Sequence, residues 1–136
     1  MAKKIIKTKE FELPVYSARV IFVYSNSYEA ISDFAKSEEL SDRDIACLKN
    51  GGYSGYCFHV EDDTPAKKSN TYVFIKKNTN KYKEIDAITH EMLHAVVNIL
   101  TERGLKFNSQ NEEAYTYLTG FLNSEFFKFK DGKETR

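Results

Sequence analysis

The stretch His90-Glu91-Met92-Leu93-His94 decides how the rest of the chain is interpreted, because it lies inside a segment with helical periodicity. Asn80 is a suitable N-cap before this segment, and Gly104 is a suitable stop signal after it. Between them, apolar residues recur at helical spacing, at Ile85, Ile88, Met92, Val96 and Ile99, and Leu93, Val97 and Leu100 widen the stripe. The pattern predicts a helix from about Lys81 to Arg103 with both histidines in its interior.

The spacing of the two histidines gives this helix its chemistry. Residues four apart lie on the same helix face, so His90 and His94 can offer two imidazoles to one Zn²⁺. Glu91 then lies beside the ion, where a carboxylate can act as general base for a water molecule. The alternative is a pair of ordinary histidines on an amphipathic helix. The pattern favours a zinc-dependent hydrolase.

A catalytic zinc site usually has three protein ligands and one open position, so a third ligand is expected outside the motif. The segment from Ser109 to about Lys128 predicts a second amphipathic helix. Ser109 followed by Glu112 is typical of a capping box, which gives Glu112 a local role and leaves Glu113 free. Glu113 is therefore the predicted third ligand. A solvated carboxylate favoured by the helix dipole is the alternative.

Glu113 shares its helix face with Tyr117 and Gly120. A glycine at this position is expected to permit close approach of the two helices. Tyr117 could donate a hydrogen bond to the substrate, which makes it a candidate catalytic residue, and a tyrosine of the core is the alternative.

These residues resemble the zinc sites of known peptidases. The HExxH run, followed after eighteen residues by Glu113, is similar to the gluzincin arrangement, in which a glutamate on the next helix is the third ligand. The chain also resembles small zinc metallopeptidases of phages and prophages, over roughly residues 70 to 123. The stretches that carry this likeness are His94-Ala95-Val96, Asn111-Glu112-Glu113-Ala114 and Tyr117-Leu118-Thr119-Gly120.

The resemblance implies an α+β fold of minimal zincin type, with a small mixed sheet packed on the HExxH helix and a second helix carrying the third ligand. It implies that His90, His94 and Glu113 bind Zn²⁺, and that Glu91 is the general base of a metallopeptidase acting on a peptide or protein. One departure is that no downstream His or Asp stands out as the transition-state stabiliser of larger gluzincins. The remaining histidine, His59, is predicted to lie on a strand without a metal role.

A second function stays open. The chain could be a non-enzymatic protein-binding module, such as a phage anti-host factor, that keeps zinc as a structural staple, because 136 residues leave little material for a substrate cleft. Only the region from Asp42 to Thr64 is long enough to form the wall of such a cleft. A fourth protein ligand such as His59 or Cys57 would favour the staple, and an open position would favour hydrolysis.

Length and composition predict one domain spanning residues 1–136, with frayed ends at 1–10 and 129–136. Twenty basic and twenty acidic residues cancel, which argues against nucleic acid as the main partner. The sequence lacks the pattern of a secretory signal and of a membrane span, so a cytoplasmic protein is expected. Cys47 and Cys57 are expected to be small buried thiols, and the oligomeric state is not predicted.

The rest of the chain predicts a strand at Ala18–Tyr24, after extended chain at 11–15, and a helix that opens at Ser27. A short helix near 42–49 follows, and then an antiparallel pair at 53–61 and 70–77. The expected order is strand, helix, strand, strand, helix, helix. The sheet should cover one side of the HExxH helix and leave one edge open, where a peptide substrate can add as a strand.

Overall fold

The computed structural model describes residues 3–61 and 69–132. Four strands form one sheet in the order β1-β2-β4-β3, with β2 and β4 parallel in the middle and β1 and β3 antiparallel at the edges. Four α-helices and one short 3₁₀ helix, Pro14–Tyr16, accompany the sheet within these residues. The predicted α+β class is therefore confirmed. The elements are β1 (Ile6–Leu13), β2 (Ala18–Ser25), α1 (Tyr28–Ser37), α2 (Asp42–Asn50), β3 (Gly55–Val60), β4 (Ser69–Lys76), α3 (Lys81–Glu102) and α4 (Glu112–Lys130).

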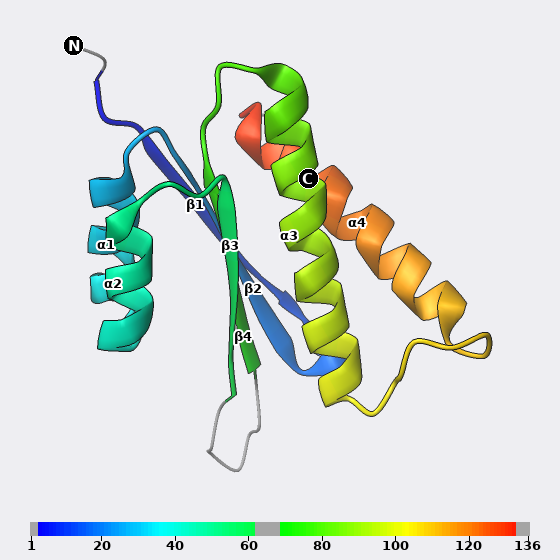
Figure 1. Cartoon of the computed structure of the whole chain (residues 1–136). Coiled ribbons are helices and arrows are strands. Elements are labelled where there is room, and N and C mark those ends of the chain that lie inside the picture. The colour runs from blue at the N-terminus through cyan, green and yellow to red at the C-terminus, as the bar shows by residue number, and fades with distance from the viewer. Residues whose placement is uncertain (1–2, 62–68, 133–136) are drawn as a thin grey trace.

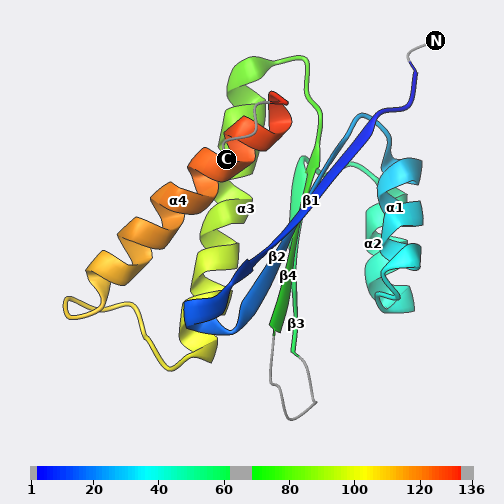
Figure 2. The same ribbon diagram turned by 180° about the vertical axis from the view of Figure 1, so that it is seen from behind.

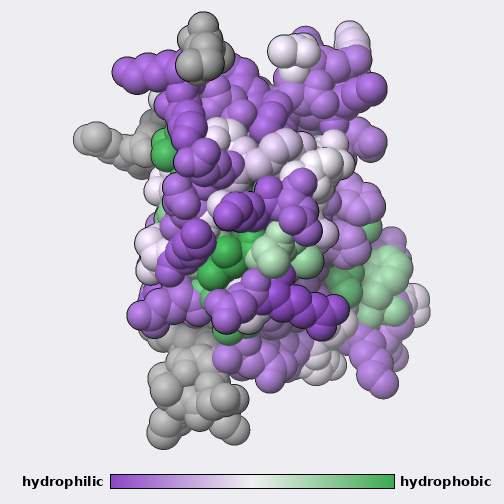
Figure 3. Space-filling model, turned by 60° about the vertical axis from the view of Figure 1, so that its left-hand side comes forward, coloured by the Kyte–Doolittle hydropathy of each residue, from purple (hydrophilic) through white to green (hydrophobic). Residues whose placement is uncertain are grey.

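Helices cover both faces of the sheet, α1 and α2 on one side and α3 and α4 on the other (Figures 1 and 2). Successive strand residues point to opposite faces, so Phe22 packs in the core under α3 and α4, while Val23 packs in the core under α1 and α2. Burial on both faces explains why the central strands are continuously apolar. On the side that carries α1 and α2, the surface is mostly hydrophilic around a small central hydrophobic area (Figure 3).

The observed bounds of α3, Lys81–Glu102, agree with the predicted ones to within one residue. The Asn80 side chain caps it by accepting from the amides of Tyr82 and Lys83, and Gly104 with φ +80° follows its end. The centre of the apolar stripe is fully buried, but the expected widening is wrong in part, because Leu93 and Val97 stay exposed.

Polar contacts hold the first turn of α3. The buried Glu84 carboxylate accepts hydrogen bonds from the Tyr24 hydroxyl at 2.8 Å and from the Asn78 amide at 2.7 Å. It also pairs with the Lys130 ammonium at 3.2 Å. Since these partners come from β2, the loop before α3 and the end of α4, the network fixes the start of α3 to the rest of the core.

The expectation of frayed ends is wrong where the structure describes them. Residues 6–10 belong to β1, which pairs with β2 along its whole length. Every second residue of β1 is half-buried, and Phe11 and Leu13 pack on the core, whereas its lysines and glutamates make it a charged edge that resists pairing with other chains. At the other end Phe129 is buried, and α4 continues to Lys130. Residues 133–136 lie outside the described part.

The predicted capping box is also wrong. The helix α4 begins at Glu112, and its N-cap is Asn111, which makes no side-chain capping bond. The Asn108 side chain instead accepts from the amides of Gln110 and Asn111, so it fixes the turn ahead of the helix in place of Ser109. Glu112 therefore has no capping-box role that would distinguish it from Glu113.

The strand expected at Ala18–Tyr24 and the short helix expected near 42–49 are found, but the expected order omitted β1, and the 3₁₀ helix Pro14–Tyr16 replaces the end of the extended chain expected at 11–15. Cys47 and Cys57, which were expected to be buried, are only partly buried.

The Ser27 side chain caps α1 by accepting from the Ala30 amide, and β3 and β4 form the expected antiparallel pair. Because β3 is an edge strand beside α3, an open sheet edge lies next to the HExxH helix, as predicted. Among the described residues, no helix combines the length and apolar character needed to span a bilayer.

Candidate metal centre

The imidazoles of His90 and His94 converge on one point. Their Nε2 atoms are 3.3 Å apart, and the rings meet edge to face with centroids 4.9 Å apart. Both side chains are exposed. Two nitrogens that bind one tetrahedral Zn²⁺ at about 2.0–2.1 Å each lie about 3.3–3.4 Å apart. The donor pair therefore fits a single zinc ion.

Glu91 is the third member of this cluster. Its Oε2 lies 3.9 Å from His90 Nε2, and the donor atoms of the three residues all lie within 4.8 Å of one another. The side chain is buried, and this burial raises the pKa of the Glu91 carboxyl above its ordinary value, against the opposing effect of the two histidines. A carboxylate with a raised pKa is a better proton acceptor near neutral pH.

A close approach of β3 buries Glu91. A Cβ atom at Gly55 would lie only 2.7 Å from Glu91 Cγ and 3.0 Å from Ile75 Cδ1, so this position requires glycine. Gly55 is not among the site residues predicted from the sequence. An isolated glycine inside a strand pattern is a signal of close backbone approach, and that signal was available.

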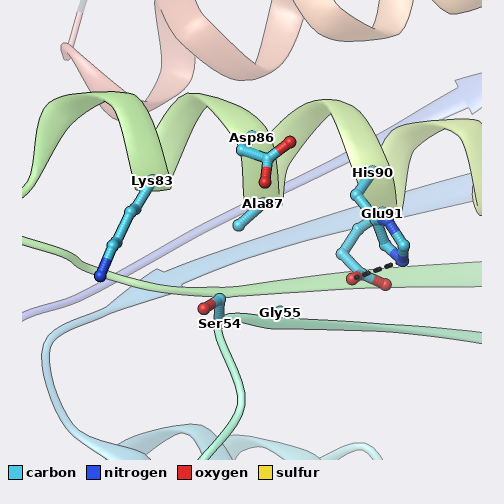
Figure 4. A pocket seen from close by; sticks show the side chains of 7 residues that line it. All are labelled: Ser54, Gly55, Lys83, Asp86, Ala87, His90 and Glu91. Atoms are coloured by element: carbon cyan, nitrogen blue, oxygen red, sulfur yellow. Dashed lines mark ion pairs between the residues drawn. The ribbon is translucent and has the colours of Figure 1, made fainter.

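Two cavities flank the cluster, one of about 430 Å³ and one of about 370 Å³, and they share Gly55, His90 and Glu91. Figure 4 shows Lys83, His90 and Glu91 pointing from α3 toward the segment that carries Gly55. Together the cavities form a groove between α3 and the edge strand β3.

A polar row follows this groove along α3. Asp86, His90, His94 and Asn98 recur every four residues, and all four line the two cavities. Sequence reasoning identified only the two central members, although spacing by four places the whole row on one helix face. The row extends the candidate site by one turn on each side of the histidines.

The structure does not bring Glu113 into the cluster. Among the described residues, the group that could hold a metal consists of His90, Glu91 and His94. Glu113 is exposed in the first turn of α4, where the helix dipole favours a negative charge. Its role as a ligand stays a prediction.

Tyr117 and Gly120 differ from their expected surroundings. Tyr117 is 76% exposed, so the alternative of a core tyrosine is wrong, and its catalytic role stays a prediction. A Cβ atom at Gly120 would meet nothing within 4 Å, so this glycine does not mark close packing of the two helices.

His59 is engaged at the far end of α3. Its Nδ1 lies 2.8 Å from Thr71 Oγ1, and its Nε2 lies 2.6 Å from Glu102 Oε2. Cys57 lines the second cavity near His94, and its burial, reinforced by the charge of Glu91, raises the pKa of the thiol to about 12. Within the described part of the chain, neither residue joins the metal-binding cluster.

Comparisons of the chain with protein-family models, with curated proteins and with solved structures found no match.

Proposed function

We propose that this protein is a zinc-dependent hydrolase, a small metallopeptidase with a minimal zincin fold, in which His90 and His94 hold the ion. The observation that carries the proposal is the 3.3 Å separation of two exposed Nε2 atoms beside a buried carboxylate. Paired imidazoles with a neighbouring glutamate are the donor set that zinc hydrolases use.

Zinc bound at this pair would polarise a substrate carbonyl and lower the pKa of a water molecule. Glu91 accepts a proton from the attacking water and then donates it to the leaving amine. The raised pKa of its carboxyl suits the first step, because a carboxylate that binds a proton too weakly is a poor base, and the proton that it then holds is available for the leaving amine. Gly55 keeps this carboxyl in place from the strand side.

Glu113 is the proposed third ligand, and Tyr117 is the proposed hydrogen-bond donor to the substrate. Both side chains are exposed on α4, which packs against α3. The resemblance to small phage and prophage peptidases supports the same assignment, and the expected place of action is the cytoplasm.

The substrate binds as an extended peptide in the groove along β3. The outer edge of β3 offers backbone groups that pair with no other strand of residues 3–61 and 69–132, because β3 is the last strand of the described sheet. Strand addition at this edge would lay a peptide bond over Glu91 and the two histidines.

The test combines metal content with proteolysis. The purified protein should carry close to one zinc per chain by elemental analysis and cleave an unfolded protein substrate. Glu91→Gln should keep the zinc and lose about 10²–10⁴-fold in turnover, because an amide cannot take the proton from water. The matched control is Glu102→Gln, which changes a second poorly exposed glutamate of α3 away from the cluster. Zinc binding without Glu91-dependent cleavage would overturn the hydrolase and favour the binding module.

A further inference from the structure

A second hollow, of about 590 Å³, lies between α3 and α4. Leu93 and Val97 of α3 line one side, Thr116, Gly120 and Asn123 of α4 line the other, and Phe107 of the connecting segment lines one end. We call these six residues the α3–α4 groove. Leu93 is 53% exposed and Phe107 is 68% exposed, so the walls are apolar and open to solvent.

Gly120 keeps the groove open at a cost to the helix. A glycine inside a helix is less stable than an alanine, and such a glycine is usually explained by a neighbour that packs against it. Here a Cβ atom would meet nothing within 4 Å, so no contact in the described residues explains the glycine. The space above it is available for a group that the protein itself does not supply.

Asn123 adds a polar requirement to the groove. Its Oδ1 atom is buried and has no hydrogen-bond partner. A buried acceptor without a donor is unfavourable, so rotation of the Asn123 side chain toward a bound N–H or O–H group would relieve this cost. An apolar side chain with a backbone N–H beside it, which is what a polypeptide offers, meets both requirements.

The groove is continuous with the candidate metal centre. His90, Leu93 and Val97 are spaced by three and four residues, so they follow one another along the same face of α3. A polypeptide that passes over the imidazoles therefore has the groove directly beside it.

We propose that the α3–α4 groove binds a bulky apolar side chain of the polypeptide substrate, and that Asn123 accepts a hydrogen bond from the adjoining backbone. This inference rests on the proposed function and names its substrate class. The enzyme cleaves polypeptides that carry a large apolar residue near the scissile bond, and it discriminates against polar or glycine-rich ones.

Binding can be measured apart from cleavage. The chain contains no tryptophan, so the fluorescence of a tryptophan-containing peptide reports its own binding. The probe is a peptide blocked at both ends, with leucine and tryptophan alternating with serine, added to the protein with and without zinc. A matched peptide with serine at every apolar position serves as competitor and should not displace the probe.

Gly120→Leu is the decisive variant, because its Cβ atom meets no neighbour and the rest of its side chain would extend into the groove. It should weaken binding of the probe by about ten- to hundredfold, the value of one buried leucine side chain, and keep the zinc. Gly120→Ala should change binding much less. Val97→Asp, on the opposite wall, should weaken binding as well, whereas Val15→Asp makes the same change at an exposed valine in the 3₁₀ helix and should have no effect.

Three results would overturn the proposal: no binding of the apolar probe by the wild type, equal binding by wild type and Gly120→Leu, or a self-associated protein that Gly120→Leu converts to monomer in sedimentation. The last result would assign the groove to a second copy of the chain. Failure of the proposed function would look different. The wild type would bind the probe and Gly120→Leu would abolish this binding, but no Glu91-dependent cleavage would be observed. Cleavage that Gly120→Leu leaves unchanged would instead remove the groove and keep the hydrolase.

Discussion

The two histidine-containing regions along α3 differ in what their imidazoles contact. His59 uses both ring nitrogens, on Thr71 and on Glu102, and its side chain is only 13% exposed. His90 and His94 are exposed, and within the described residues they contact each other and, through His90, the carboxylate of Glu91. A histidine whose polar atoms are satisfied inside the fold is structural, whereas a convergent exposed pair is suited to bind something from outside.

Accessibility decides between the two regions more firmly than residue type does. Thr71, His59 and Glu102 form a hydroxyl, an imidazole and a carboxylate in one chain of contacts, the residue types of a nucleophilic site. Thr71 is 0% exposed on the central strand β4, so a substrate cannot reach its hydroxyl. This network therefore joins α3 to the sheet and performs no chemistry.

The largest expected effect concerns zinc itself. His90→Ala or His94→Ala should abolish zinc binding, because each removes one of two converging donors. His59→Ala should keep one zinc per chain while lowering stability. Elemental analysis of the three purified variants makes the comparison directly. Full zinc retention in either His90→Ala or His94→Ala would remove the site from consideration, and zinc loss in His59→Ala would mean that the two regions are not separate.

The third ligand is tested by the two adjacent glutamates of α4. Glu113→Ala should weaken zinc binding by more than about hundredfold, since even changes outside the ligand shell cost about ten- to hundredfold. Glu112→Ala, an equally exposed neighbour in the same helix turn, should leave the affinity unchanged. Competition titration against a chromophoric chelator places both on one scale. Loss with Glu112→Ala alone would shift the ligand by one residue, and no loss with either would require a ligand elsewhere.

The contact between β3 and Glu91 is tested with matched glycines. Gly55→Ala should displace the Glu91 side chain, because the added Cβ would lie 2.7 Å from Glu91 Cγ. Turnover should fall by about ten- to hundredfold while zinc is retained, since a base misplaced by about 1 Å costs about 10²-fold. Gly120→Ala adds the same methyl group in the open α3–α4 groove, so any effect should fall on KM, and kcat at saturating substrate should be unchanged. Equal kcat for both variants would show that the close approach does not position the base.

The smallest expected effect is on stability at the His59 end. Burial by itself raises the pKa of the Glu102 carboxyl, but its hydrogen bonds, including the one to His59, and the charge of Arg103 lower it overall. A carboxyl with a lowered pKa in the folded state contributes stability above its unfolded pKa of about 4.3, and this contribution is lost as the pH falls through the folded pKa. Glu102→Gln should therefore cost about 1–3 kcal/mol at pH 7 and less at pH 3.

Urea unfolding of wild type and Glu102→Gln at both pH values measures this difference. Glu91→Gln is the contrasting variant, since the pKa of its parent carboxyl is raised and not lowered. A difference in the free energy of unfolding between wild type and Glu102→Gln that stays the same at low pH would contradict the lowered pKa of the Glu102 carboxyl.

The parts of the fold that follow local rules could be predicted. The boundaries of α3 follow from Asn80 and Gly104, and the histidine pair follows from a spacing of four. The strand β1 is not predicted from the sequence, because its lysines and glutamates obscure the alternation of exposed and half-buried positions along it. The start of α4 was misplaced because Asn108 and Ser109 both offer a side-chain acceptor, and sequence alone does not decide which one the turn uses.

The parts of the site that depend on tertiary contact could not be predicted. Burial of Glu91 comes from Gly55, thirty-six residues away along the chain, and the α3–α4 groove comes from the angle at which two helices separate. Periodicity describes which face of a helix is apolar and does not say whether a neighbour covers it, which is why Leu93 and Val97 were expected in the stripe and are exposed.

The two ends of α3 are each fastened to the sheet, by Glu84 with Tyr24 and Lys130 at the first turn and by Glu102 with His59 at the last. These contacts oppose sliding of the helix along its axis and rotation about it, so the backbone positions of His90 and His94 are set without a bound ion. Capture of the ion by this pair then needs no preceding rearrangement of the backbone. Zinc uptake in stopped-flow mixing should begin with a second-order phase whose rate is proportional to zinc concentration.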